Sequence, residues 1–275
     1  MSILPAAKIA GGPHVMGIVN LTPDSFSDGG KHRDVRAAIG AALALLEAGA
    51  DIVDVGGEST RPGAAPVETD EELRRVLPMI EGVRKITAAP ISIDTMKPAV
   101  AEAALAAGAT LWNDVNALQA PGALDVAARR NAAVVLMHMQ GAPRTMQADP
   151  RYADVVAEVS AFLAARADAA RSAGVRAIWV DPGIGFGKTL AHNLALMRAL
   201  PAIAAAANAP VLFGASRKSF IQKIDATAGD AGDRLGGSIA AALHAARAGA
   251  AIVRVHDVRE TVQALQVQRA LEGRA

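Results

Sequence analysis

The chain has 275 residues, with 28 lysines and arginines against 27 aspartates and glutamates, and it contains no cysteine. The lack of cysteine excludes a disulfide scaffold, a thiol nucleophile and zinc or iron–sulfur sites built on cysteine. A formal net charge of +1 argues against a protein that tracks nucleic-acid phosphates, and we expect no nucleic-acid partner. The length and even composition predict one domain over residues 1–275.

Short β-branched runs alternate with longer segments of helical period along the chain. The predicted strands are 15–19, 51–55, 90–93, 110–113, 133–137, 177–180, 211–213 and 251–255. The predicted helices are 35–48, 70–86, 99–106, 121–130, 152–172, 193–206, 237–248 and 259–265. Four helices end just before the next strand in a glycine, where a left-handed residue is favoured: Gly49, Gly108, Gly174 and Gly249.

The strand-then-helix order predicts the fold class. The strands are continuously apolar, which is typical of a parallel sheet covered on both faces. Eight such units in this length favour an α/β protein with a (β/α)8 TIM barrel as its single domain. A doubly wound open sheet is the alternative, because spacing alone does not close a barrel.

The sequence predicts no targeting or membrane segment. Pro5 and Lys8 interrupt the N-terminal run before an apolar signal region forms. The most apolar stretch, 199–215, contains Pro201 and Pro210 and is shorter than the ~20 apolar residues of a membrane span. We therefore expect a cytoplasmic protein with no membrane partner.

Polar residues gather at the carboxyl ends of the predicted strands, where barrels of this kind carry their active sites. In chain order they are Asn20, Glu58, Thr60, Arg61, Asp94, Asn113, Asp114, His138, Asp181, Ser216, Arg217, Lys218, Ser219, Arg254 and His256. The opposite strand ends are mostly alanine, glycine and proline. This asymmetry predicts a functional site at one end of the barrel.

Single members of this set also have structural interpretations. Asp94 precedes a helix and could cap its N-terminus. His138, between two methionines, is typical of a core histidine with satisfied hydrogen bonds. The acidic run 70–72 predicts a solvent-exposed first helical turn. Three further histidines are interpreted as surface or structural residues: His32, His192 and His244.

The polar residues divide into two chemical groups. Asp94, Asn113 and Asp181 are rich in acceptors, which suits a heterocycle with an edge of N–H donors, such as a 2-amino-4-oxo pyrimidine ring. Asn20, Arg254 and His256 follow the first and last strands, neighbours in a closed barrel, and suit a phosphate-type anion. Three long loops rich in glycine and proline predict lids: 20–31, 56–68 and 141–150.

One glycine-rich segment resembles a phosphate-binding loop but lacks the glycine spacing of that motif. Residues 183–189 read Gly-Ile-Gly-Phe-Gly-Lys-Thr, but Pro182 stands where the first glycine of that pattern belongs. The segment also follows the sixth predicted strand rather than the first. We therefore reject a nucleoside-triphosphatase interpretation.

Eight segments together resemble one enzyme family. Residues 16–30 and 54–63 resemble the first and second signatures of the dihydropteroate synthases. The further matches, in family order, are 92–95, 113–115, 137–141, 181–188, 216–219 and 254–257. The resemblance implies a pterin-binding barrel that acts in folate biosynthesis. It would join p-aminobenzoate to 6-hydroxymethyl-7,8-dihydropterin pyrophosphate with Mg²⁺, release pyrophosphate, and work as a homodimer.

The resemblance also implies roles for individual residues. The pterin-binding residues would be Asp94, Asn113, Met137, Asp181, Phe186 and Lys218. The pyrophosphate-binding residues would be Asn20, Thr60, Arg254 and His256, with Asn20 also a ligand of Mg²⁺. The p-aminobenzoate site, where sulfonamides compete in this family, would comprise Phe26, Asp28, Arg61, Pro62, Lys218 and Ser219. The catalytic residues would be Asp94, Lys218, Arg254 and His256.

Two alternatives share the pterin site. A methyltetrahydrofolate-binding methyltransferase barrel would use the same pterin residues, but 60–62 and 216–219 match the p-aminobenzoate side of the synthases. A catalytically inactive pterin-binding paralogue is the other alternative, and intact Asp94, Arg254 and His256 argue against it.

Overall fold

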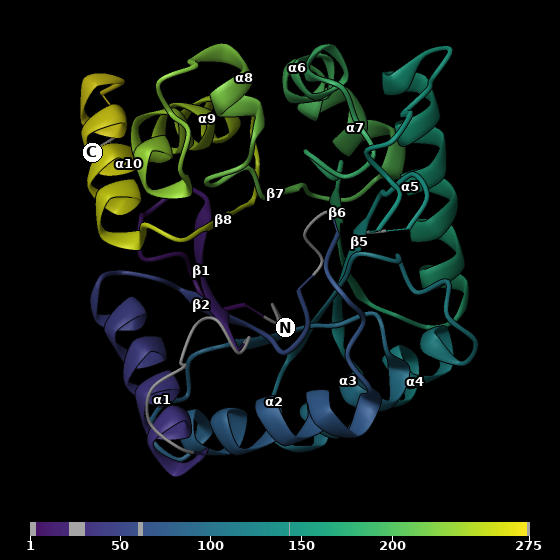
Figure 1. The fold of residues 1–275 in the computed structure, drawn as a ribbon, viewed down its shortest axis with the longest axis vertical. Coiled ribbons are helices and arrows are strands. Elements are labelled where there is room, and N and C mark those ends of the chain that lie inside the picture. Colours follow the sequence, from purple (N-terminus) through teal and green to yellow (C-terminus); the bar gives the residue numbers. More distant parts are fainter. Residues whose placement is uncertain (1–3, 22–30, 60–62, 143, 274–275) are drawn as a thin grey trace.

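Eight parallel strands form a ring that helices surround (Figure 1). The computed structural model describes residues 4–21, 31–59, 63–142 and 144–273, and of residues 31–34 it describes the backbone alone. The strands are β1 (His14–Asn20), β2 (Ile52–Gly56), β3 (Ile91–Asp94), β4 (Leu111–Asp114), β5 (Ala133–Met137), β6 (Ala177–Asp181), β7 (Leu212–Phe213) and β8 (Ile252–Val255).

The order of the strands establishes the barrel. The hydrogen-bonded order is β6-β5-β4-β3-β2-β1-β8-β7, with every pair parallel. A parallel bridge between Val180 and Val211 joins the two ends of this order. The predicted (β/α)8 barrel is therefore confirmed, and the open-sheet alternative is wrong.

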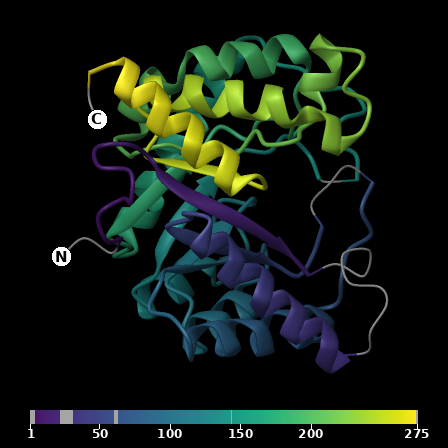
Figure 2. The same ribbon diagram turned by 90° about the vertical axis from the view of Figure 1, so that its left-hand side faces the viewer.

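The helices lie outside this ring. They are α1 (Lys31–Glu47), α2 (Thr69–Arg84), α3 (Pro98–Ala106), α4 (Ala123–Arg129), α5 (Val155–Ser172), α6 (Leu190–Arg198), α7 (Leu200–Ala207), α8 (Phe220–Ile224), α9 (Leu235–Arg247) and α10 (Val258–Leu271), with a 3₁₀ turn η2 (Ala231–Arg234). In Figure 2 the long strand β1 runs between α1 and α10, and it contacts both.

Two predicted regions differ from the structure. The helix predicted over 193–206 is divided at Ala199 into α6 and α7. Pro201 stands in the first turn of α7, a position where the missing N–H of proline is tolerated. Two short elements between β7 and α9, α8 and η2, are not predicted from the sequence.

The predicted glycine caps are confirmed. Gly49, Gly108, Gly174 and Gly249 have φ values of 110°, 115°, 95° and 81°, a region that favours glycine over residues with a Cβ. In the described part of the chain no single helix is long and apolar enough to cross a membrane; α6 and α7 pass that test only as a pair bent by 69°.

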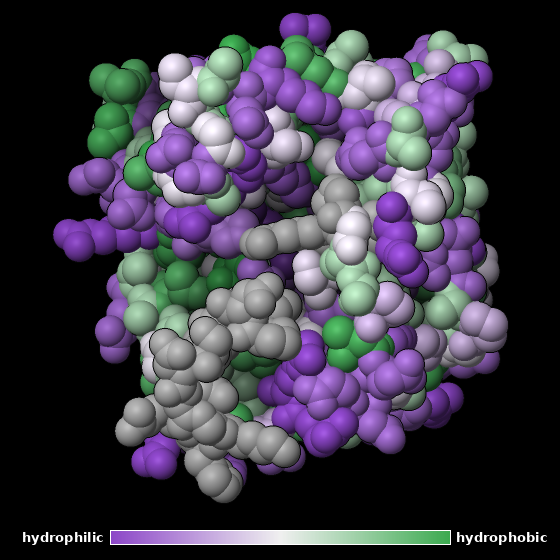
Figure 3. Space-filling view, in the orientation of Figure 1, coloured by the Kyte–Doolittle hydropathy of each residue, from purple (hydrophilic) through white to green (hydrophobic). Residues whose placement is uncertain are grey.

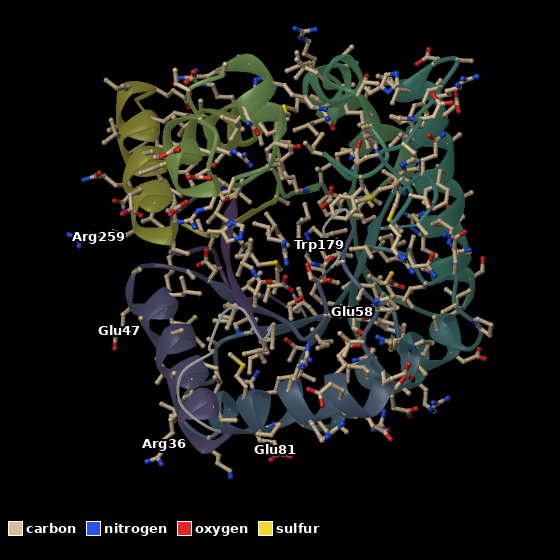
Figure 4. All side chains as sticks on the ribbon, viewed as in Figure 1. Arg36, Glu47, Glu58, Glu81, Trp179 and Arg259 are labelled. Carbon is tan, nitrogen blue, oxygen red and sulfur yellow. The ribbon has the colours of Figure 1, made fainter. Side chains whose placement is uncertain are left out.

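Apolar side chains form a layer inside the barrel and another between the strands and the helices. The inner layer consists of Leu4, Met16, Ile52, Leu111, Ala133, Val135, Leu212 and Ile252, with Ala177 and Trp179 partly buried against it. Figure 4 shows Trp179 in the middle of the ring, whereas Glu47, Glu81 and Arg259 point outward from the helices. Each fully buried large aliphatic side chain stabilises the fold by roughly 1.5–3 kcal/mol.

The strand period of two carries this inner face into the functional site. Residues two positions apart on a strand point to the same side of the sheet. Asp54 therefore follows the interior residue Ile52, and Arg254 follows Ile252. The apolar interior thus becomes polar at the carboxyl ends of the strands.

Candidate active site

The carboxyl ends of the strands surround a hollow. Figure 3 shows hydrophilic side chains around it in the middle of one face. The parallel registers align Asn20 with Gly56, Gly56 with Asp94, and Asp94 with Asn113. Residues from β1 to β4 therefore share one level of the barrel.

Arg254 on β8 binds two carboxylates from across the barrel. Its Nε donates to Asp54 Oδ2 at 2.6 Å, and its Nη2 donates to Asp94 Oδ2 at 2.7 Å. The Asp54 side chain is fully buried, and those of Arg254 and Asp94 are 19% and 14% exposed. A guanidinium presents its donors as a rigid fork, so it fixes both carboxylates relative to one another.

The electrostatics of this cluster favour the arginine cation. Burial alone would lower the pKa of Arg254, but the carboxylates of Asp54 and Asp94 raise it above its ordinary value. Burial raises the pKa of Asp94 to about 7, although Arg254 opposes this shift. The alternative interpretation of Asp94 as a helix cap is wrong, because α3 has Lys97 at its N-cap and Asp94 binds Arg254 instead.

Asn113 extends the cluster on β4. Its Nδ2 donates to Asp54 Oδ2 at 3.4 Å, and the residue is 5% exposed. Asp54 Oδ1 and Ser92 Oγ are buried without a hydrogen-bond partner. Unpaired polar atoms are costly to bury, so neither atom is explained by the stability of the fold.

Asp181 closes the acceptor side of the hollow at the end of β6. Its Oδ1 accepts from the backbone N of Gly183 at 2.7 Å. Its Oδ2 lies 3.6 Å from the point where a Cβ of residue 214 would stand, and Arg254 Cβ lies 3.8 Å from that point. Gly214 therefore leaves room for both. Burial raises the pKa of Asp181, and Lys218 is the first of several cationic or donor groups that oppose the rise.

Lys218 reaches the same region from the loop after β7. Its Nζ donates to Ile184 O at 2.6 Å and lies 4.6 Å from the centre of the Phe186 ring, a cation–π distance. Burial lowers the pKa of Lys218 to about 8, although Asp181 opposes the shift. The structure thus brings together the predicted residues Asp181, Phe186 and Lys218.

The turn before Lys218 is tied to the end of β8. Ser216 Oγ lies 3.0 Å from His256 Nδ1 and accepts from His256 N at 3.2 Å. Arg217 has φ 59°, unusual for a residue with a Cβ, and its guanidinium forms two hydrogen bonds with the Asp257 carboxylate. These contacts hold the turn against the end of β8 and so fix where its side chains lie relative to the hollow.

Gly56 provides space beside Asn20. A Cβ at position 56 would lie 3.8 Å from Asn20 Oδ1 and 3.9 Å from Asp94 Oδ2. Both oxygens therefore border one small space. Among the described residues no group of three or more histidines, aspartates and glutamates could hold a metal ion. Mg²⁺ often takes only one or two protein oxygens and completes its shell with water and substrate phosphates, so Asn20 Oδ1 fits such an ion.

A second buried cluster supports the loop after β2. Lys97 Nζ pairs with Glu58 and lies 2.6 Å from Glu72 Oε2. The prediction that 70–72 is a solvent-exposed turn is therefore wrong for Glu72, which is fully buried. The helical period explains the error, because Glu72 precedes Val76 by one turn on the buried face of α2.

Two members of the predicted polar set are structural. Asp114 accepts from the backbone N of Asn116 and of Leu118, each at 2.8 Å, and burial raises its pKa to about 6. His138 is 8% exposed and its Nδ1 lies 3.0 Å from Lys188 Nζ. Its interpretation as a satisfied core histidine is confirmed.

Two of the other three histidines are structural, as expected. His192 Nδ1 accepts from Thr189 N at the start of α6, and His244 Nε2 lies 2.9 Å from Met197 O. The side chain of His32 lies outside the described residues.

Several predicted site residues cannot be placed. Phe26, Asp28, Thr60, Arg61 and Pro62 lie outside the described residues, as do most of the 20–31 loop and the centre of the 56–68 loop. Met137 is 4% exposed at the end of β5, in register with Asp181. Ser219 is exposed and precedes α8.

Three charged residues have no role predicted from the sequence: the buried Asp54 and Lys188, and the partly buried Lys97. Asp54 had a visible signal, since it is an acid within the apolar strand 51–55 on the same face as Ile52. Lys97 and Lys188 stand in loops, where a lysine alone indicates nothing.

The comparisons with known proteins agree with the geometry. A family model described as pterin binding enzyme matches residues 16–256. The chain is 48% identical over 260 residues to the dihydropteroate synthase of Escherichia coli K12, covering 94% of this chain and 91% of that one.

Two solved structures have the same fold. The dihydropteroate synthase of Xanthomonas albilineans with 4-aminobenzoic acid matches with a TM-score of 0.89 and 51% identity, over 95% of this chain and 93% of that one. The Yersinia pestis enzyme in a sulfonamide drug complex matches with a TM-score of 0.89 and 44% identity, over 95% of each chain. This chain belongs to the dihydropteroate synthases, within the pterin-binding enzyme family.

Proposed function

We propose that this chain condenses p-aminobenzoate with 6-hydroxymethyl-7,8-dihydropterin pyrophosphate to give 7,8-dihydropteroate and pyrophosphate. One observation carries the proposal: Arg254 on β8 binds Asp54 and Asp94 on the acceptor-rich side of the hollow and stands two residues before His256. A substrate with a donor-edged ring at one end and an anion at the other fits that arrangement. The relatives described above bear the name of this reaction.

The pterin ring would bind on the acceptor side. The Asp181 carboxylate and the Asn113 amide suit the 2-amino and ring N–H donors of a 2-amino-4-oxo pyrimidine. Lys218 would donate toward the ring from above Phe186, and Met137 would supply an apolar contact. Charge-assisted hydrogen bonds of this kind contribute about 1.5–3 kcal/mol each.

The pyrophosphate would bind on the opposite side. Arg254 and His256 would face its oxygens together with Asn20 and Thr60, the last of which is placed by family resemblance. Asn20 would also hold Mg²⁺. When bound, Mg²⁺ neutralises charge on the pyrophosphate oxygens.

The arylamine would enter between these two groups. Lys218 and Ser219 stand at the turn after β7, where they would receive the p-aminobenzoate carboxylate. Phe26, Asp28, Arg61 and Pro62 complete this subsite in the family pattern. The sulfonamide complex of the Yersinia pestis relative supports a sulfonamide-sensitive subsite here.

The chemistry exchanges one bond at the pterin methylene carbon. The C–O bond to pyrophosphate breaks, and its electron pair leaves with the pyrophosphate, whose charge Arg254 and His256 stabilise. Asp94 Oδ2 lies 2.7 Å from Nη2 of Arg254, the arginine that would face the pyrophosphate. The Asp94 carboxylate would stabilise the positive charge left on the pterin methylene carbon. The arylamine nitrogen then bonds to that carbon and loses one proton to the released pyrophosphate or to water. No strong base is needed, because an aniline is unprotonated at neutral pH and the ammonium formed on bonding is acidic.

We also propose that the chain works in the cytoplasm as a homodimer, as the family pattern implies. Light scattering of the purified protein across micromolar concentrations tests the dimer. A monomer mass over that range would contradict it.

Pyrophosphate release tests the function directly. The purified chain is mixed with the pterin pyrophosphate and Mg²⁺, with and without p-aminobenzoate. Release that depends on p-aminobenzoate and is suppressed by a sulfonamide supports the synthase. Tight pterin binding without release would favour the inactive paralogue, and methyl transfer from methyltetrahydrofolate would favour the methyltransferase type.

A further inference from the structure

Lys188 is a buried lysine whose three ammonium protons all have protein acceptors. It is 1% exposed, and its Nζ lies 3.0 Å from His138 Nδ1, 3.3 Å from His138 O and 2.9 Å from Phe186 O. Among the described residues it forms no salt bridge. The lysine of this glycine-rich segment is therefore directed into the protein rather than toward a phosphate.

The contact with His138 fixes the state of the imidazole. A lysine ammonium only donates, so while Lys188 is charged His138 Nδ1 accepts and the imidazole proton is on Nε2. Burial, followed by the charge of Lys188, lowers the pKa of His138 to about 3. The ring also packs edge-on against Phe162 at 5.0 Å between centroids. His138 is thus neutral over the whole neutral pH range, and it accepts from Lys188 while that lysine is charged.

The segment that ends in Lys188 is packed backbone to backbone on the chain after β5. A Cβ at Gly183 would stand 1.9 Å from His138 O, and one at Gly187 would stand 2.6 Å from Gln140 O. The hydroxyl of Tyr152 donates to Gly187 O at 2.9 Å. The glycines permit this close approach, and Lys188 and Tyr152 each form hydrogen bonds that hold it.

The same segment carries the acceptor side of the hollow. Gly183 N binds Asp181 Oδ1, Ile184 O accepts from Lys218, and the Phe186 ring lies beneath the Lys218 ammonium. A shift of the segment would therefore also move the side chains of Asp181 and Lys218. Lys188 also acts through its charge, since it opposes the rise that burial causes in the pKa of Asp181.

We propose, resting on the pterin-binding function above, that Lys188 is a positioning residue of the pterin site. Its ammonium ties the 182–188 segment to the end of β5, adds a positive charge that favours the ionised, accepting form of Asp181, and holds Phe186 under Lys218. It does not touch the substrate.

The pH dependence of pterin binding distinguishes this role from simple loop support. Burial lowers the pKa of Lys188 to about 7, so its charge is present chiefly below that pH. The titratable and charged groups around it are Asp181, Lys218, His138 and Tyr152, and Asp181 is the acid among them whose pKa burial raises. Without Lys188, Asp181 becomes protonated at a higher pH, and pterin affinity is lost earlier as the pH falls.

The experiment compares K188M with Y152F. Both remove hydrogen bonds that hold the same segment, but only K188M removes a charge. Affinity for 6-hydroxymethyl-7,8-dihydropterin, which lacks the pyrophosphate, is measured by calorimetry between pH 5.5 and 8.5. We expect K188M to bind at least tenfold more weakly than the unmodified chain at pH 6, with a smaller ratio at pH 8.5. For Y152F, the ratio of its dissociation constant to that of the unmodified chain is expected to vary by less than about twofold over this pH range. The ligand's own titration affects all variants equally and so cancels in the ratio.

A second variant guards against loss of folding in K188M. K188Q keeps two amide donors for the same carbonyls without the charge, and we expect it to show the same pH trend with a smaller loss at pH 8.5. A ratio for K188M or K188Q that does not change with pH, or that equals the Y152F ratio, overturns the proposal. If the unmodified chain does not bind the pterin, the proposed function itself fails, whereas normal binding with an unaffected K188M contradicts the role of Lys188 alone.

Discussion

Arg254 and Asp54 stand 200 positions apart in the sequence and meet inside the barrel with a 2.6 Å hydrogen bond from Nε to Oδ2. β1 separates the two strands that carry them. Asp54 is fully buried, so the hydrogen bond forms only when β8 and β2 both stand beside β1. The position of Arg254 in the site therefore depends on the pairing of these strands. The same guanidinium that binds Asp54 also holds Asp94.

Removal of the Asp54 carboxylate is therefore expected to destabilise the protein. D54A leaves Arg254 buried with only one of its two close partners, and breaking such a pair costs about 3–5 kcal/mol. Urea unfolding at pH 7.5 measures the change in free energy of unfolding. E47A, on the exposed face of α1, is the control and should change it by less than about 0.5 kcal/mol. Equal stabilities of D54A and E47A would contradict the structural importance of the pair.

The ionised form of Asp94, which the reaction requires, is expected to lower the free energy of unfolding. Its pKa rises from the ordinary 3.8 to about 7 through burial, although Arg254 opposes the shift. An acid with a raised pKa in the folded state stabilises the fold while protonated and loses that contribution as the pH rises toward 7. The neutral D94N avoids this loss, so its stability relative to the unmodified chain should improve between pH 5 and pH 8.

The same D94N variant should lose activity. Removal of one stabilising charge from a reaction centre lowers the rate by about 10²–10³-fold. Melting curves at the two pH values and pyrophosphate release at pH 8 check both parts. A relative stability that worsens from pH 5 to pH 8 would show that the ionised carboxylate stabilises the fold.

Asp181 is expected to control pterin affinity. D181N keeps the shape but replaces one accepting oxygen by a donor, which removes a charge-assisted hydrogen bond worth about 1.5–3 kcal/mol. Pterin binding should weaken about 10- to 100-fold, with a much smaller change in the p-aminobenzoate KM. Because the pKa of Asp181 is raised, the unmodified chain should lose pterin affinity as the pH falls, and D181N should lack this dependence. Unchanged pterin affinity in calorimetry would refute the assignment.

The fold and the polar end of the site could largely be predicted from the sequence, for a local reason. Strand runs, helical period and glycine caps are short-range patterns, and the barrel follows from their repetition. The division of 193–206 at Ala199 could not be predicted from Pro201. A proline in the first turn of a helix and a proline inside a helix look alike in sequence.

Contacts between distant charges could not be predicted in the same way. Nothing in the sequence pairs Lys97 with Glu58 and Glu72, or Lys188 with His138, because each contact depends on how two loops approach. Glu72 is instructive, since its place on the apolar face of α2 was visible one turn before Val76. The acidic first turn is present, but it places Glu72 on the buried face of α2, where Lys97 pairs with it.

Arg61 is expected to act on the arylamine alone. In the family pattern it belongs to the p-aminobenzoate subsite, and it lies outside the described residues. R61A should raise the p-aminobenzoate KM about tenfold or more, the loss of one charge-assisted contact, and leave pterin affinity unchanged. Steady-state kinetics with each substrate varied in turn makes the measurement. An unaltered KM for p-aminobenzoate would remove Arg61 from this subsite.

Gly183 and Gly249 allow a comparison between backbone strain and steric contact. Both have positive φ, 69° and 81°, so alanine at either position adds about 1–2 kcal/mol of strain. A Cβ at Gly249 meets nothing within 4 Å, whereas one at Gly183 would stand 1.9 Å from His138 O. G249A should therefore cost only the strain, and G183A about 4 kcal/mol or more. Urea unfolding of the two variants decides the point: equal losses would mean that the chain after β5 can yield, and the close contact would then not fix the position of the segment that carries Phe186.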